Sequence, residues 1–96
     1  MEDKINYCNM IVSAYHGVEE IDEYNLKEYT LLNIKKILDD FITNNDVDYN
    51  LDEAREKALN TPLKIRLKDA LIVLNQMNES QELLHIIKER IRSLND

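Results

Sequence analysis

Apolar residues recur at spacings of three and four along most of this 96-residue chain, and only Gly17 and Pro62 supply the residue types that commonly break helices. Such spacing gathers apolar side chains on one face of an α-helix. No segment alternates apolar and polar residues over the length of a strand, and the Asn-Gly turn typical of β-hairpins is absent. The sequence therefore predicts an all-α fold.

A glycine and an asparagine are expected to bound the first two helices, which the periodicity places over about 4–16 and 25–43. Gly17 follows the first apolar stripe directly, so we expect it to adopt the left-handed conformation that closes many helices. Asn25 and Glu28 have the spacing of a capping box, in which each side chain bonds a free backbone N–H at the helix start. We therefore expect Asn25 to cap the second helix.

Caps and a proline also divide the second half of the chain. Asn50 is expected to cap a short helix that ends near Leu59. Thr61 is expected to cap the next helix, with Pro62 at its first position, where a missing N–H costs nothing. This helix carries apolar residues both on its main face and to the side of it, and we expect it to be the most buried. Asn78 is expected to cap the last helix.

The length and composition predict one domain over residues 1–96, folded as a compact bundle of four main helices plus one short helix. No apolar run approaches the roughly 20 residues that cross a bilayer. The chain starts with acidic residues and shows no signal-peptide pattern. Its single cysteine, Cys8, cannot form an internal disulfide. We therefore expect a cytoplasmic protein that is not inserted in a membrane.

The charge of the chain favours a basic protein partner over nucleic acid. Lys and Arg number 12 against 19 Asp and Glu, which gives a net charge of −7. An acidic surface repels phosphate and attracts cationic surfaces. Two acidic segments, each with a tyrosine that suits an interface, form the predicted partner-binding site. Its residues are Glu19, Glu20, Asp22, Glu23, Tyr24, Asp46, Asp48 and Tyr49.

An Asn- and Asp-rich segment resembles the start of a calcium-binding loop but departs from it afterwards. Asp46, Asp48 and Asn50 place oxygen atoms at alternate positions. A calcium loop then needs a glycine where Leu51 stands and a bidentate glutamate where Lys57 stands. We therefore interpret the segment as an ordinary loop between two helices, because Asn and Asp bond readily to nearby backbone.

The chain offers few residues suited to catalysis or to zinc. His16 and His85 are its only histidines, whereas structural zinc sites take four ligands, commonly Cys and His. Cys8 shares an apolar stripe with Ile5 and Ile11, so we expect a small core residue rather than a nucleophile. With one glycine, the chain also lacks a phosphate-cradling loop. The sequence predicts no enzyme activity, no metal and no cofactor.

We therefore predict a small acidic, non-catalytic module that binds a protein by steric and electrostatic docking. It would inhibit, neutralise or regulate that partner, as immunity proteins, antitoxins and phage-encoded inhibitors do. Abundant Asn, Ile and Lys are typical of an AT-rich genome, which fits a bacterium or its phage. No motif in the chain identifies a family.

Two other functions stay open at this point. The short helix and the Pro62 helix have the order of a helix-turn-helix, and a DNA-binding regulator would use the basic residues Arg55, Lys64, Arg66 and Lys68. Alternatively, the protein would be a homodimer or larger structural oligomer, in which an apolar seam on the last helix pairs with the same seam of another copy. That seam consists of Leu84, Ile87, Ile91 and Leu94.

Overall fold

The computed structural model describes residues 2–21, 24–78 and 81–94, and it contains five helices and no strand in these ranges. The helices are α1 (Glu2–Val18), α2 (Tyr24–Asn44), α3 (Leu51–Leu59), α4 (Leu63–Gln76) and α5 (Gln81–Leu94). The predicted all-α fold with four main helices and one short helix is confirmed. None of the five described helices is long and apolar enough to pass through a membrane.

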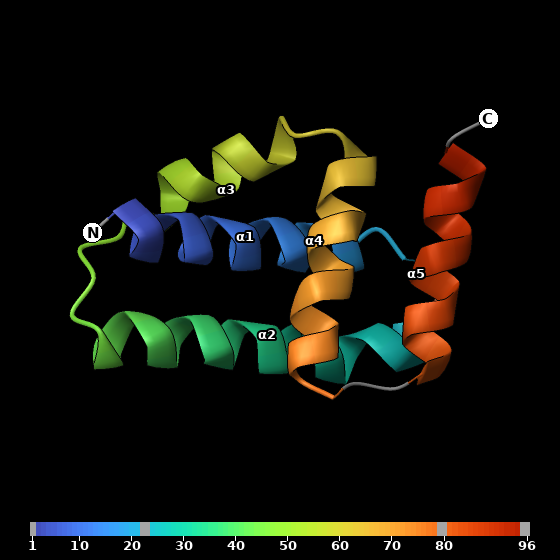
Figure 1. The fold of residues 1–96 in the computed structure, drawn as a ribbon, viewed down its shortest axis with the longest axis horizontal. Coiled ribbons are helices and arrows are strands. Elements are labelled where there is room, and N and C mark those ends of the chain that lie inside the picture. Colours follow the sequence, from blue (N-terminus) through green and yellow to red (C-terminus); the bar gives the residue numbers. More distant parts are fainter. Residues whose placement is uncertain (1, 22–23, 79–80, 95–96) are drawn as a thin grey trace.

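Helix α1 lies at the centre of the fold, and three other helices pack on it. Helix α2 runs antiparallel along one side of α1 and α3 lies along the other, while α4 crosses α1 (Figure 1). Helix α5 packs on α4. The expectation that α4 is the most buried helix is wrong, because α1 is surrounded by more neighbours. Its buried residues are Cys8, Ile11, Val12, Ser13, Ala14, His16, Gly17 and Val18.

Gly17 does not end α1, which continues to Val18, and no glycine has a positive φ. The absence of its side chain instead lets α1 and α4 approach closely. A Cβ atom at Gly17 would lie 2.6 Å from the backbone oxygen of Arg66 and 2.7 Å from its carbonyl carbon. The glycine therefore serves the crossing of two helices, and the predicted left-handed cap at this position is wrong.

One of the predicted caps before the fourth helix is confirmed and one is wrong. Asn50 caps α3, because its side-chain oxygen accepts a hydrogen bond from the Glu53 backbone N–H at 3.1 Å. Thr61 does not cap α4, since its hydroxyl donates to the backbone oxygen of Lys57 at 3.0 Å. Pro62, with a φ of −54°, takes the cap position without any side-chain hydrogen bond.

The predictions that Asn25 caps the second helix and that Asn78 caps the last helix are also wrong. Asn25 falls inside α2, which begins at Tyr24. Asn78 has a φ of 56° and directly follows Met77, the C-cap residue of α4. It therefore closes α4 in the left-handed conformation that asparagine tolerates, and it stands three residues before the first residue of α5.

The apolar seam of α5 is only partly exposed. Leu84 and Ile87 are buried, as is Leu83, which the seam did not include. Ile91 is half-buried and Leu94 is 40% exposed. These residues belong to the helix that packs on α4, so the first half of the seam is already covered within one chain. A homodimer that pairs through the whole seam is not compatible with this packing.

Candidate functional site

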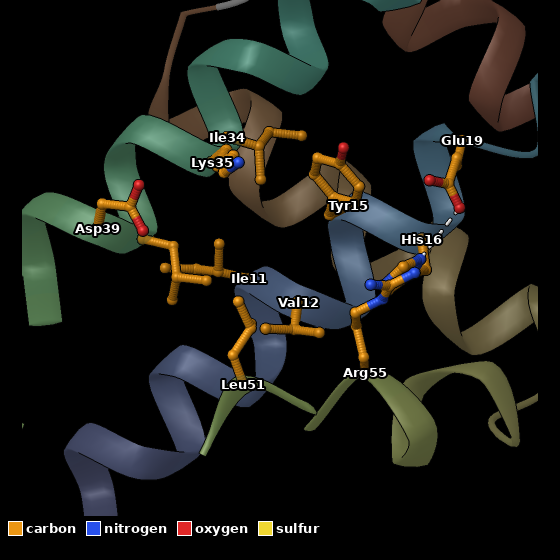
Figure 2. A pocket seen from close by; sticks show the side chains of 11 residues that line it. Ile11, Val12, Tyr15, His16, Glu19, Ile34, Lys35, Asp39, Leu51 and Arg55 are labelled. Carbon is orange, nitrogen blue, oxygen red and sulfur yellow. Dashed lines mark hydrogen bonds and ion pairs between the residues drawn. The ribbon is translucent and has the colours of Figure 1, made fainter. Parts of the chain in front are cut away.

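A groove with a volume of about 200 Å³ lies where α2 and α3 flank α1 (Figure 2). Four buried aliphatic residues from α1 and α2 line it and form what we call its floor. The floor residues are Ile11, Val12, Ile34 and Leu38. All four are ordinary members of the core. The groove is thus a depression of the surface that lies directly over the apolar core.

Charged side chains of both signs stand around this floor. Lys35 and Asp39 come from α2, Arg55 comes from α3 and Glu19 comes from the end of α1. All four side chains are exposed, and Leu51 of α3, at 42% exposure, completes the rim. An apolar centre enclosed by charged groups is the usual composition of a protein–protein interface.

His16 lies at the α1 end of the groove and is almost completely buried, with 3% exposure. Its Nδ1 is 3.1 Å from the Glu19 carboxylate, which is half in solvent (Figure 2). Its backbone oxygen accepts a hydrogen bond from the Arg66 guanidinium at 3.2 Å. His16 stands in the last turn of α1, where a positive charge is favoured by the helix dipole. This histidine fixes Glu19 at the groove rim.

Among the described residues, one member of the predicted partner-binding set lines this groove. Glu19 lines it, and the neighbouring Glu20 is exposed and lies 3.8 Å from Arg66. Asp46 and Asp48 are exposed in the loop between α2 and α3, which leads directly into Leu51. Asp22, Glu23 and the side chain of Tyr24 lie outside the described residues.

Tyr49, predicted as a contact residue, is tied to the body of the protein. It is half-buried, and its hydroxyl donates to the side-chain oxygen of Asn9 on α1 at 2.6 Å. Burial, together with the nearby Cys8, raises the pKa of Tyr49 to about 12. Its phenol therefore stays neutral at physiological pH and holds the acidic loop against α1.

Cys8 is fully buried, in agreement with the core position expected for it. Burial raises the pKa of the Cys8 thiol above its ordinary value, so the reactive thiolate form is disfavoured. Among the described residues there is also no group of three or more His, Cys, Asp or Glu side chains placed to hold a metal ion.

Arg66 cannot act as the DNA-contacting residue of the helix-turn-helix alternative. Its side chain is only 11% exposed, and two of its nitrogen atoms donate to backbone oxygens. Nε donates to the Thr61 backbone oxygen at 3.0 Å, and Nη1 donates to the His16 backbone oxygen. Arg55 lines the groove on a different helix. The structure therefore does not assemble the four basic residues into one exposed patch.

The sequence did not single out Leu51, Lys35 or Asp39 as site residues. Helix α3 buries only two alanines, Ala54 and Ala58. Side chains this small bring α3 close to α1 without filling the space on either side of it. A short helix whose apolar face is made of alanines is therefore the sequence signal that would have indicated grooves beside α3.

A second hollow of about 270 Å³ lies on the other flank of α3, between α1 and α4. Ser13 is one of its lining residues and is only 7% exposed. Within the described ranges, the Ser13 hydroxyl is the one buried side-chain polar atom without a hydrogen-bond partner. A buried hydroxyl that lacks a hydrogen-bond partner destabilises the fold.

We expect Ser13→Ala to raise the free energy of unfolding by about 1 kcal/mol, because it removes the unbonded hydroxyl and favours the helix. Urea denaturation measures this change. Ser93→Ala is the control, since the Ser93 hydroxyl is exposed and donates to the Arg90 backbone oxygen at 2.9 Å. A loss of stability in the Ser13 variant would show that its hydroxyl has a partner in solution.

The comparisons with known proteins give no relative for this chain. No family model, no curated protein and no solved structure matches it. The fold and the groove therefore carry the functional argument alone.

Proposed function

We propose that this protein acts by binding a protein with a basic surface, and that it inhibits, neutralises or regulates that partner by docking on it. The observation that carries the proposal is the position of the groove. Two acidic segments that are far apart in sequence, 19–20 and 46–53, each contribute one residue to the lining of this groove, Glu19 and Leu51.

The chain segments that contribute to the groove carry more acidic than basic residues, while the rim itself has two charged residues of each sign. The segments 19–20, 35–40 and 46–57 line the groove or lead into it, and their acidic side chains outnumber the basic ones. Complementary charge accelerates the encounter of two proteins and selects the correct partner, while the apolar centre supplies most of the binding free energy. The groove region offers both contributions in one place.

This mode of action is that of an immunity protein, an antitoxin or a phage-encoded inhibitor. Such a protein needs only a stable surface, and the buried Cys8 and the neutral Tyr49 leave the described core without an activated nucleophile. We place the action in the cytoplasm, where a lone unpaired cysteine persists. Affinity capture from the native cell or its host, followed by mass spectrometry, identifies the partner.

Reversing two charges near the groove is expected to slow association with that partner. We expect Asp39→Lys combined with Asp48→Lys to reduce the association rate about tenfold at low salt, with a smaller effect at high salt. Both side chains are exposed, so the fold is retained. Stopped-flow or surface plasmon resonance measurements at several salt concentrations provide the rates.

The control carries the same change in net charge on a helix that does not line the groove. Glu82→Lys combined with Glu89→Lys alters two exposed residues of α5. Equal slowing by both double variants would mean that only net charge matters. An unchanged rate in the Asp39 and Asp48 variant would rule out the proposed docking surface.

A further inference from the structure

We infer that the groove receives one large apolar side chain of the partner, presented by a segment that also carries basic residues. This inference rests on the proposed function and specifies what the groove binds. The groove is lined by the four floor residues, by Tyr15 and His16 of α1, and by the rim. The rim consists of Glu19, Lys35, Asp39, Leu51 and Arg55.

The size of the groove favours a side chain over a free small molecule. Sites for drug-sized ligands usually have volumes of about 300–1,000 Å³. This groove, at about 200 Å³, is smaller and stays open to solvent on one side. A single protruding residue of a protein partner fits such a space, and residues of this kind dominate the energetics of many interfaces.

The chemistry of the floor requires an apolar anchor. Ile11, Val12, Ile34 and Leu38 contribute only aliphatic carbon, and their exposure ranges from 0% to 6%. A polar or charged group inserted here would lose its hydrogen bonds to water and find no partner on the floor. Leucine, methionine or phenylalanine at the tip of the partner segment satisfies this environment.

The rim determines what surrounds the anchor. Glu19 directly follows the end of α1 and Asp39 stands on α2, so basic residues on either side of the anchor meet a carboxylate. Lys35 and Arg55 have only donors, and they suit the backbone carbonyl oxygens of the inserted segment. The net charge of −7 of the whole chain then favours a segment whose net charge is positive.

Two leucines on α3 allow a matched test of this inference. Leu51 lies on the groove rim with 42% exposure, whereas Leu59, at the other end of the same helix, is 53% exposed and is not part of the groove lining. Tryptophan at position 51 adds bulk beside the floor. We expect Leu51→Trp to weaken binding of the identified partner about tenfold or more, and Leu59→Trp to change it less than about twofold.

A second measurement does not need the partner. N-acetyl-leucinamide and N-acetyl-phenylalaninamide serve as probes for the anchor, and methyl NMR follows the isoleucine, leucine and valine signals of the protein. We expect concentration-dependent shifts at Ile11, Val12, Leu38 and Leu51 and none at Leu59. Leu51→Trp should abolish these shifts.

The two proposals fail in different ways. If the partner binds the Leu51→Trp variant as well as the original protein, and the probes shift no groove methyl, the anchor inference is wrong although protein binding stands. If the Asp39 and Asp48 variant also binds at an unchanged rate, the docking surface itself is wrong. Loss of binding in both leucine variants would likewise overturn the anchor inference, because the effect would then not be specific to the residue that lines the groove.

Discussion

Replacing Gly17 with alanine is expected to lower the free energy of unfolding by about 2 kcal/mol, although alanine is the better helix former. The added Cβ would lie 2.6 Å and 2.7 Å from the backbone oxygen and carbon of Arg66. These are backbone atoms of another helix, so no flexible side chain can rotate away. Crowding of this kind costs about 3 kcal/mol, and the gain in helix propensity returns about 1 kcal/mol.

Equilibrium denaturation in urea measures this loss, and the midpoint of thermal unfolding should fall by roughly 10 °C for a domain of this size. Asn6→Ala is the control, because Asn6 is an exposed residue of the same helix. Alanine at this position gains helix propensity and adds no atom toward α4, so we expect a change of a few tenths of a kcal/mol at most. If Gly17→Ala is stabilising, α1 and α4 do not cross as closely as the structure shows.

The all-α fold could be predicted from the sequence because it depends on local patterns. The apolar stripe that contains Cys8 and Ile11 marks α1, and Asn50 marks the start of α3 through a bond to a residue three positions away. Information of this kind lies within one or two turns of helix. The expected helix, which follows the predicted cap at Asn25 and runs to about Thr43, accordingly agrees with α2 to within two residues at each end.

The role of Gly17 could not be predicted in the same way, because it depends on a residue almost fifty positions away in the sequence. A glycine after an apolar stripe is typical of a helix end, and only the crossing with α4 shows that the helix continues through it. Asn78 gives the opposite case. It has the spacing of a cap for α5, but its local conformation closes α4.

The candidate site was partly predictable for a similar reason. Acidic segments are visible in the sequence, and Glu19 lines the groove, whereas Asp46 and Asp48 precede the rim residue Leu51 in the chain without lining the groove themselves. The groove itself is not visible, because Ile11 and Leu38 have the periodicity of ordinary core residues. Whether a core residue is covered depends on how α2 and α3 sit on α1, which periodicity does not specify.

Arg66→Ala is expected to be the most destabilising of the substitutions considered, because this side chain completes the hydrogen bonding at the end of α1. The last carbonyl groups of a helix lack partners within it. Here the backbone oxygens of Tyr15, Gly17 and Val18 accept from the N–H groups of residues 19–21. The oxygen of His16 accepts from the buried guanidinium of Arg66 instead.

The same guanidinium donates to the Thr61 backbone oxygen, so it joins the end of α1 to the connection between α3 and α4. Alanine would leave two carbonyl groups without this donor, and we expect the free energy of unfolding to fall by about 3 kcal/mol. Lys68→Ala, an exposed change on the same helix, should stay within about 0.5 kcal/mol in the same urea titration. If Arg66→Ala behaves like the Lys68 control, Arg66 is exposed in solution and the DNA-binding alternative regains one of its four basic residues. A large loss of stability would show that Arg66 is buried in solution, where its hydrogen bonds hold α4 against the end of α1.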